Sequence, residues 1–242
     1  MSISKSFQNK VAVVTGSTRG IGRATAKMLL REGASVAICG RDPESVATAV
    51  LELRAETGGK VSGKHADVRD YEQVHALFEF VDREFGGLDF LVNNAGVGKF
   101  AKVSEISVPD WHTTLDTNLS GVFYCSREAL FRFGNRGGGY IVNISSLAGK
   151  NAFAGGAAYN ASKFGLNGFS EALMLDTRYD HVRVSTIMPG SVATDFGAGE
   201  VGTDWKIWPE DVAEIVRMIL EMPERTLISQ VEVRPSRPKR NT

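Results

Sequence analysis

Tyr159 and Lys163 lie four residues apart in the segment AAYNASKFG, whose other members are mostly small. On a helix, residues i and i+4 share one face, so the phenol and the ammonium can act at a single place. A free tyrosine is a poor base near neutral pH because its pKa is about 10. A neighbouring cation favours the phenolate, so we expect Lys163 to lower the pKa of Tyr159. The pair is compatible with proton transfer, although most Tyr-x-x-x-Lys pairs belong to amphipathic helix surfaces.

The glycine-rich segment TGSTRGIG at residues 15–22 joins an apolar run to a helical pattern. Its glycines at 16, 20 and 22 permit a tight turn and a close approach of a pyrophosphate to backbone N–H groups. The N-terminus of the following helix adds positive potential for that anion. Such turns also occur at plain strand-to-helix connections, but the position after the first predicted strand favours nucleotide binding.

Residues 39–42, CGRD, end the second predicted strand and indicate which nucleotide binds. An acidic side chain there would bond a free ribose 2′-hydroxyl, whereas arginine accepts a 2′-phosphate. Arg41 lies near this position, Arg19 of the glycine-rich turn can reach the same phosphate, and Asp42 before Pro43 suits a helix N-cap. We therefore predict NADP(H) in preference to NAD(H); the alternative is that both arginines are solvated surface charges.

Short β-rich runs alternate with amphipathic segments along the chain, which predicts an α/β fold. We expect strands within 10–16, 35–41, 60–68, 88–96, 139–146, 182–190 and 229–236. We expect helices over about 20–32, 43–57, 70–85, 109–134, 157–179 and 209–221. The predicted architecture is one Rossmann-type, doubly wound domain over 1–242, with a mainly parallel seven-stranded sheet and helices on both faces. Ligands bind such sheets at the carboxyl ends of the strands, where the unusual residues of this sequence fall.

The composition is that of an ordinary globular protein, in which 43% of the 242 residues are hydrophobic and 23% are charged. The 28 basic and 28 acidic residues balance, so charge does not indicate a nucleic-acid or membrane partner. The four histidines lack metal-ligand spacing, and the two cysteines lack the spacing of a disulfide framework. The N-terminus has no apolar leader, and no apolar run is long enough to cross a bilayer. We predict a cytoplasmic protein that uses no metal.

Seven segments together resemble the short-chain dehydrogenase/reductase family, of the type that includes 3-oxoacyl-carrier-protein reductases. They are TGSTRGIG (15–22), ADV (66–68), NNAG (93–96), TNLSGVF (117–123), IVNISS (141–146), YNASK (159–163) and PGSVAT (189–194). Their order and spacing cover roughly residues 8–221, so the set is far more specific than any one motif. The resemblance implies an oxidoreductase that transfers hydride to or from a nicotinamide cofactor.

The resemblance also implies four catalytic residues. Tyr159 would be the general acid/base, Lys163 would hold the nicotinamide ribose, and Ser146 would polarise the substrate carbonyl. Asn118 would hold a water that links Lys163 to solvent, although a polar residue at a helix interruption can be purely structural. The cofactor-binding residues implied are Gly16, Ser17, Thr18, Arg19, Gly20, Ile21, Gly22, Arg41, Asp67, Val68, Asn94, Gly96, Tyr159, Lys163, Pro189, Gly190, Val192 and Thr194.

The predicted function is that of an NADP(H)-dependent carbonyl reductase or alcohol dehydrogenase, which interconverts a ketone and a secondary alcohol. A 3-oxoacyl thioester reductase, acting on acyl-carrier protein or CoA, is the alternative within the family. A non-catalytic nucleotide-binding or scaffold protein of the same fold is the alternative outside it. Family analogy further implies a homo-oligomer, a dimer or a tetramer, through the helices expected over 109–134 and 157–179.

The loop at about 195–208 is the expected substrate loop and carries Phe196, Trp205 and Trp208. We expect either a partly aromatic lid over a hydrophobic pocket or a loop that its tryptophans anchor to the body. The basic tail at about 234–242 departs from the glycine-rich ending of carrier-protein reductases. The sequence therefore does not identify the substrate.

Overall fold

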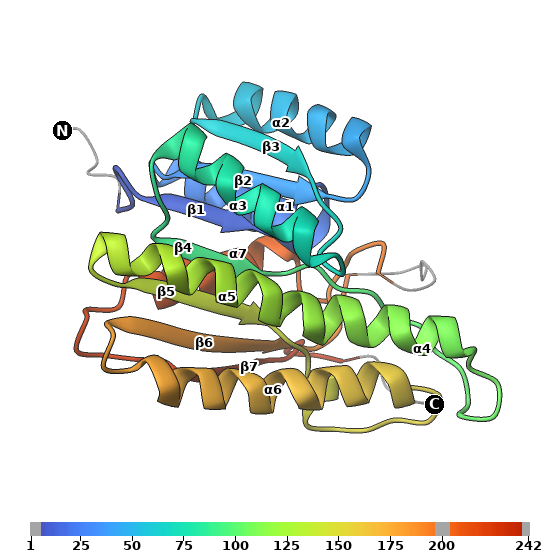
Figure 1. The fold of residues 1–242 in the computed structure, drawn as a ribbon. Helices are drawn as coiled ribbons and strands as arrows, with labels where there is room; N and C mark the ends of the chain where they lie inside the picture. The colour runs from blue at the N-terminus through green and yellow to red at the C-terminus, as the bar shows by residue number, and fades with distance from the viewer. Residues whose placement is uncertain (1–5, 197–203, 239–242) are drawn as a thin grey trace.

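A seven-stranded sheet forms the centre of the computed structural model, which describes residues 6–196 and 204–238 (Figure 1). All neighbouring strands pair in parallel, in the order β3-β2-β1-β4-β5-β6-β7. The strands are β1 (Val11–Val14), β2 (Ser35–Gly40), β3 (Val61–His65), β4 (Phe90–Asn93), β5 (Gly139–Ile144), β6 (Val182–Pro189) and β7 (Gln230–Val233). The order reverses between β1 and β4, which is where such sheets bind ligands. The predicted Rossmann-type α/β fold is confirmed.

The strands end earlier than predicted at the sheet edge where ligands are expected. β1 ends at Val14 and β4 at Asn93, whereas the expected segments ran to residues 16 and 96. The residues that follow leave the sheet as loops after one more main-chain bond, from the Thr15 N–H to the Val92 carbonyl at 3.0 Å. The Thr15 side chain then joins the two loops, because its Oγ1 accepts hydrogen bonds from the Asn94 and Ala95 N–H groups. The functional segments are therefore loops held by the strands, not strands themselves.

The helices of the described residues are α1 (Gly20–Arg31), α2 (Pro43–Thr57), α3 (Tyr71–Phe85), α4 (Val108–Leu115), α5 (Gly121–Phe133), α6 (Ala157–Thr177) and α7 (Pro209–Leu220). The single helix expected over 109–134 is wrong, because a π-helical turn at Asp116–Ser120 separates α4 from α5. Gly121 N–H bonds to the Asp116 carbonyl, five residues back, so the backbone accommodates an extra residue in this turn. The turn contains Asn118, which is fully buried.

Two helix layers cover the two faces of the sheet, with α3, α5 and α6 on one face and α1, α2 and α7 on the other (Figure 1). Successive strand residues alternate between the two layers: Val13 packs with α3 and α5, and Val14 packs with α1 and α7. Both side chains are fully buried. No helix of the described residues is long and apolar enough to cross a bilayer.

Local signals set where the helices after β2 and β3 begin and end. The predicted N-cap at Asp42 is confirmed, because its carboxylate accepts a hydrogen bond from the Ser45 N–H at 2.9 Å. Asp70 caps α3 in the same way. Both helices end at glycines in the left-handed region, with φ of 64° at Gly58 and 76° at Gly86. These caps keep the loops that follow β2 and β3 short.

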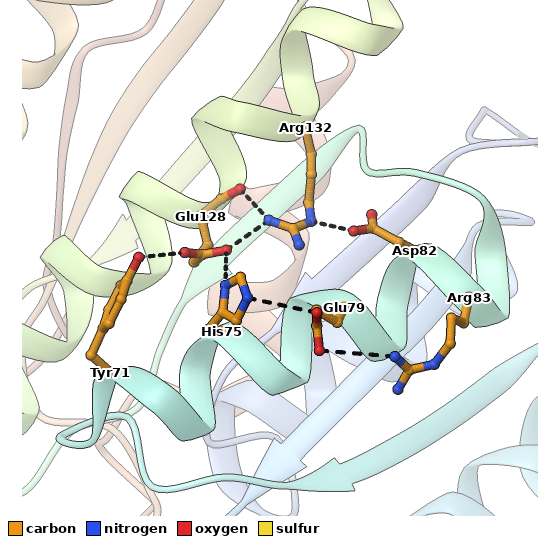
Figure 2. A network of polar contacts seen from close by, with 7 residues as sticks. All are labelled: Tyr71, His75, Glu79, Asp82, Arg83, Glu128 and Arg132. Carbon is orange, nitrogen blue, oxygen red and sulfur yellow. Dashed lines mark hydrogen bonds and ion pairs between the residues drawn. The ribbon is translucent and has the colours of Figure 1, made fainter.

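A polar cluster joins α3 to α5, and we call it the α3–α5 network (Figure 2). Its members are Tyr71, His75, Glu79, Asp82, Arg83, Glu128 and Arg132. Glu128 lies at its centre and is 2% exposed. One carboxylate oxygen accepts a hydrogen bond from the Tyr71 hydroxyl at 2.7 Å, and the other lies 2.8 Å from Arg132 Nη1 and 3.2 Å from His75 Nδ1. Arg132 Nε also donates to Asp82 at 2.8 Å. The buried carboxylate therefore has partners on both oxygens.

Candidate active site

A cleft of about 1230 Å³ runs along the carboxyl ends of the strands, from the loop after β2 to the N-terminal turns of α6. Most of the predicted cofactor residues line it. They are Gly16, Thr18, Arg19, Gly20, Ile21, Arg41, Asp67, Val68, Asn94, Gly96, Tyr159, Lys163, Pro189, Gly190, Val192 and Thr194. Of the predicted catalytic residues, Ser146, Tyr159 and Lys163 also line it. The fold thus brings segments that are far apart in the sequence to one edge of the sheet.

The glycine-rich turn has the shape that a pyrophosphate requires. Gly16 and Gly20 have φ of 60° and 55°, in the left-handed region that favours glycine. A Cβ on Gly16 would lie 2.8 Å from the Cα of Ala95, so a larger residue would push the turn away from the β4 loop. α1 begins at Gly20, and its N-cap residue, Arg19, makes no side-chain capping hydrogen bond. The first-turn N–H groups of α1 therefore face the cleft without a side-chain cap, which fits an anionic ligand.

Ser17 and Gly22 support this turn and do not line the cleft, so their predicted contact with the cofactor stays a prediction. Ser17 is fully buried, and its hydroxyl donates to the Val14 carbonyl at 2.6 Å and accepts from the Cys39 N–H at 3.1 Å. The hydroxyl therefore joins β1 to β2. A Cβ on Gly22 would lie 2.5 Å from the Gly16 carbonyl oxygen, so this glycine permits close packing of α1 against the turn.

The two asparagines after β4 have different structural partners. Asn93 Nδ2 donates to Asn143 Oδ1 at 2.8 Å and so joins β4 to β5. Asn94 Nδ2 donates to the carbonyls of Thr15 and Gly16 at 2.9 and 3.0 Å. These hydrogen bonds of Asn94 thus join the β4 loop to the glycine-rich turn, and Asn94 also lines the cleft.

The far end of the cleft carries the cations that a 2′-phosphate would need. Arg19 and Arg41 are both exposed and both line the cleft. Arg23 also lines it, but its guanidinium pairs with Glu52 and Glu56 of α2 at 3.1 and 2.5 Å. Arg19 and Arg41 are the two arginines whose positions fit the predicted phosphate clamp.

Tyr159, Lys163 and Ser146 converge at the other end. Lys163 is 4% exposed, and its Nζ donates to the Ile144 carbonyl at 3.0 Å and lies 5.8 Å from the ring centroid of Tyr159. Ser146 follows β5, and its Oγ accepts from the Ala148 N–H at 3.1 Å. The same Oγ lies 3.5 Å from the Pro189 carbonyl, which is a long contact for a hydroxyl donor. The Ser146 hydroxyl also interacts with the Tyr159 phenol, which places the two hydroxyl groups beside each other.

The charge states at this end depend mainly on burial. Burial raises the pKa of Tyr159 above its usual value, and the Ser146 hydroxyl offsets only part of that increase. The lowering of the Tyr159 pKa by Lys163 stays a prediction, because burial dominates here and Lys163 Nζ bonds to the Ile144 carbonyl. Burial also lowers the pKa of Lys163 to about 8. The Tyr159 phenol is thus protonated at neutral pH, and Lys163 titrates close to that range.

Asn118 lies next to the cleft but does not line it. Its Oδ1 accepts from the Val97 N–H at 2.8 Å, and its Nδ2 donates to the Val97 carbonyl at 2.9 Å and to Ser162 Oγ at 3.0 Å. Both N–H donors of the amide are thereby used. The side chain joins the β4 loop to α6, one residue from Lys163.

Three phenylalanines surround the exposed side of the Tyr159 ring, and only Phe196 was expected near the substrate. Phe100 lies 5.6 Å and Phe196 5.7 Å from the Tyr159 ring centroid, and Phe153 lies 5.9 Å from Phe100. All three line the cleft. Phe100 and Phe153 follow β4 and β5 at the ligand edge of the sheet, which is the sequence signal that could have identified them.

The predicted substrate loop is described only in part, because residues 197–203 lie outside the described residues. Trp208 is 56% exposed and stands at the N-cap of α7. Trp205 is half-buried, and the Lys206 ammonium lies 5.8 Å from its ring centroid. Of the two alternatives for this loop, anchoring by the tryptophans has less support at Trp208 than at Trp205, and the choice between lid and anchor stays a prediction.

The sequence profile described as short chain dehydrogenase matches residues 10–203. The chain therefore belongs to the short-chain dehydrogenase family, and the predicted class of oxidoreductase is confirmed. A 3alpha-hydroxysteroid dehydrogenase of Mediterraneibacter gnavus is 38% identical over 193 residues, which cover 79% of this chain and 77% of that protein.

Solved structures with the same fold include an alcohol dehydrogenase of the archaeon Thermococcus sibiricus complexed with 5-hydroxy-NADP. It has a TM-score of 0.88 and 30% identity, and the match covers 96% of this chain and 99% of that one. A metagenomic short-chain oxidoreductase in complex with NADP has a TM-score of 0.85 and 36% identity, with 96% and 100% of the two chains covered.

Proposed function

We propose that this protein is an NADP(H)-dependent oxidoreductase that interconverts a ketone and a secondary alcohol, with Tyr159 as the general acid/base. The observation that carries the proposal is the convergence of Tyr159, Ser146 and Lys163 at one end of a cleft whose middle holds the uncapped N-terminus of α1. A nicotinamide bound there would supply or accept the hydride.

In the direction of reduction, Tyr159 donates its proton to the carbonyl oxygen of the substrate. The raised pKa of Tyr159 keeps the phenol protonated at neutral pH. The Ser146 hydroxyl donates a hydrogen bond to the same oxygen, which stabilises the negative charge that develops there. Lys163, when charged, stabilises the phenolate that remains after proton transfer.

Asn118 acts as a positioning residue in this proposal. Because both of its amide donors are bonded to Val97 and Ser162, the side chain has little capacity left for a bridging water. The water relay implied by the family resemblance stays a prediction, and it would have to use another group of the π-helical turn. The amide itself holds the β4 loop against α6 beside Lys163.

The cofactor would lie along the cleft with its pyrophosphate at the glycine-rich turn. Asp67 and Val68 would line the adenine pocket, and Arg19 and Arg41 would bind the 2′-phosphate as paired cations. Pro189, Gly190, Val192 and Thr194 would hold the nicotinamide end. The NADP in the metagenomic oxidoreductase and the 5-hydroxy-NADP in the Thermococcus enzyme support this choice.

A test of the proposal measures oxidation of NADPH and NADH in the presence of ketones, for the wild type and for Tyr159→Phe. We expect the variant to lose about 10²- to 10⁴-fold in kcat with NADPH affinity kept, because only the proton donor is removed. Tyr179→Phe, an exposed tyrosine just after α6, is the matched control and should be unchanged. Full activity of Tyr159→Phe would overturn the assignment. NADPH binding without turnover of any carbonyl would favour the non-catalytic alternative.

The same assay tests the cofactor. Arg41→Ala should weaken NADPH binding about tenfold or more and leave NADH binding nearly unchanged, because a charge-assisted contact to the extra phosphate is lost. Arg178→Ala, an exposed arginine after α6, is the control. Equal losses for NADPH and NADH would contradict the phosphate clamp.

We also propose a homo-oligomer that associates through α5 and α6. Large apolar side chains stay exposed on these two helices: Phe123 (45%), Phe131 (62%), Phe164 (47%) and Leu175 (52%). Exposed apolar surface of this kind is typical of association sites. Sedimentation velocity distinguishes a monomer from a dimer or a tetramer.

A further inference from the structure

We propose that Phe100, Phe153 and Phe196 form an aromatic wall that binds a ring next to the reacting carbonyl. The proposal rests on the proposed function and deepens it by naming a substrate class: ketones, or the corresponding alcohols, in which an aromatic or alicyclic ring stands beside the carbonyl carbon. The carbonyl oxygen would lie at Tyr159 and the ring against the aromatic wall.

The aromatic wall encloses the catalytic phenol from three separate loops. Phe100 meets the Tyr159 ring edge to face, at 5.6 Å and an interplanar angle of 72°, and Phe196 lies 5.7 Å from it at 50°. Phe153 extends the cluster through Phe100, at 5.9 Å and 49°. Rings at these separations and tilts attract one another and would also attract a further ring.

The three rings are half exposed, although Phe100 contacts Phe153 and both Phe100 and Phe196 contact the Tyr159 ring. Phe100 and Phe153 are 48% exposed and Phe196 is 46% exposed. Because all three residues also line the cleft, part of this exposed apolar surface faces it, where contact with water is unfavourable. An apolar ligand that covered these surfaces would be stabilised by their burial, whereas a small aliphatic ketone would cover little of them.

Two glycines make room for the aromatic wall. A Cβ on Gly98 would lie 2.7 Å from the Phe100 ring and 3.0 Å from the Phe196 ring. A Cβ on Gly156 would lie 2.6 Å from the Phe153 ring. Any larger residue at either position would therefore displace a ring, so the backbone is adapted to the three phenylalanines.

A backbone bond holds two of the loops together. Ala101 N–H donates to the Gly155 carbonyl at 2.9 Å, which links the loop that carries Phe100 to the loop that carries Phe153. Phe153 N–H lies 3.3 Å from Asn160 Oδ1, on α6 beside Tyr159. The position of the aromatic wall relative to the catalytic phenol is thus set by main-chain contacts.

The charges around the aromatic wall favour a neutral substrate over a charged thioester. The lysines on the two loops that carry Phe100 and Phe153 pair with carboxylates: Lys99 with Asp110 at 3.3 Å, Lys102 with Glu105 at 3.7 Å and Lys150 with Glu232 at 2.9 Å. Neutralised cations attract an acidic carrier protein or a CoA phosphate less strongly than free ones. The substrate class is therefore set by the apolar rings.

The test compares 2-butanone, cyclohexyl methyl ketone, 2-acetylnaphthalene and acetoacetyl-CoA as substrates with NADPH. We expect the wild type to reduce the two ring ketones with at least tenfold higher kcat/KM than 2-butanone. Phe100→Ala, Phe153→Ala and Phe196→Ala should each lower this ratio about three- to tenfold, mainly through KM, because truncation removes ring contacts worth roughly 0.5–1.5 kcal/mol. Phe196→Leu, which keeps apolar volume, should retain more of the ratio than Phe196→Ala.

Tyr179→Ala is the matched control, because this aromatic side chain is 88% exposed and is absent from the cleft lining. In this variant, the ratio of kcat/KM for the ring ketones to kcat/KM for 2-butanone should equal that of the wild type. Binding of 2-acetylnaphthalene to the NADP⁺ complex, followed by saturation-transfer NMR, provides a readout that does not depend on turnover. The signal should weaken in the three alanine variants.

The outcomes separate this proposal from the proposed function. Equal kcat/KM for 2-butanone and the ring ketones, or ratios that the alanine variants leave unchanged, would overturn the aromatic wall while the carbonyl chemistry stands. A preference for acetoacetyl-CoA would overturn it in favour of a thioester reductase. Full activity of Tyr159→Phe would overturn only the acid/base assignment, whereas a wild type that turns over no carbonyl would remove the proposed function. In that second case the NMR binding measurement alone would test whether the aromatic wall binds a ring.

Discussion

Lys163 and Glu128 are both buried ionisable residues, but their surroundings differ. Lys163 is 4% exposed, and the hydrogen bond that the structure describes for its ammonium goes to the Ile144 carbonyl. Glu128 is 2% exposed and contacts Tyr71, His75 and Arg132 with its two oxygens (Figure 2). The ammonium has three hydrogens to donate, so it keeps capacity for a ligand, whereas the carboxylate is largely saturated by the protein.

The pKa values reflect this difference. Burial alone would raise the pKa of Glu128, but the hydrogen bonds from Tyr71, Arg132 and His75 outweigh it and lower the pKa. For Lys163 no such compensation exists, and burial lowers its pKa from 10.5 to about 8. Hydrogen bonds and ion pairs offset the desolvation cost of Glu128, so that removing this residue leaves a partner unpaired. The desolvation cost of Lys163 is not offset in this way, as is usual where chemistry requires the charge.

The largest expected effect is on stability, in the α3–α5 network. Glu128→Ala should lower the free energy of unfolding by about 3–5 kcal/mol, because Arg132, whose side chain is 11% exposed, loses its buried partner. Urea unfolding measures the loss, and kcat/KM at 20 °C should remain within about twofold of the wild type. Glu79→Ala, an exposed member of the same network at 52% side-chain exposure, should cost no more than about 1 kcal/mol. A Glu128→Ala variant as stable as the wild type would show that the network contributes little.

Lys163→Met should produce the opposite pattern. We expect kcat/KM to fall on the order of 100-fold, because a preorganised charge at the reacting centre is lost. Stability at pH 7 should be equal to the wild type or higher by up to about 3 kcal/mol, since a pKa lowered to about 8 reports a charge that the folded state disfavours. Lys60→Met, at an exposed lysine before β3, should change neither quantity. If Lys163→Met lost as much stability as Glu128→Ala, the two buried charges would contribute to stability in the same way, contrary to this prediction.

The smallest expected effect is a pH dependence of the reduction reaction. Lys163 carries its charge below about pH 8 and loses it as the pH rises through that value, whereas the raised pKa of Tyr159 keeps the phenol protonated throughout this range. The kcat/KM for ketone reduction should therefore be constant from pH 6 to 7 and fall above about pH 8, by at most tenfold per pH unit. Steady-state rates in buffers of constant ionic strength measure this, and the decrease should be absent from Lys163→Met. A profile that stays flat to pH 10 would contradict the lowered pKa.

Much of the site follows from local patterns. The i, i+4 spacing places Tyr159 and Lys163 on one helix face, and both line the cleft. The glycine-rich turn adopts the positive φ values that its glycines permit, and Asp42 caps α2 as its position before Pro43 indicates. These features depend on residues within a few positions of one another, which is why the sequence is sufficient to predict them.

Other features depend on contacts between distant segments. Ser17 resembles a cofactor ligand by position, but its hydroxyl bonds to the Val14 carbonyl and the Cys39 N–H between two strands. Asn118 resembles part of a proton relay, but its amide bonds to Val97 and Ser162. Neither partner set can be deduced from spacing along the chain, because each is created by the packing of separate elements.

The sequence by itself determined the α/β fold class, the family, and the residues that meet at the carboxyl edge of the sheet, because alternation, caps and ordered motifs are local or collinear signals. The tertiary structure alone decided how those residues are charged and what surrounds them. Burial raises the pKa of Tyr159 and lowers that of Lys163, and loops from β4, β5 and β6 bring three phenylalanines to one phenol. Desolvation and ring contacts are sums over atoms distant in the chain, so they exist only once the sheet has brought its loops together.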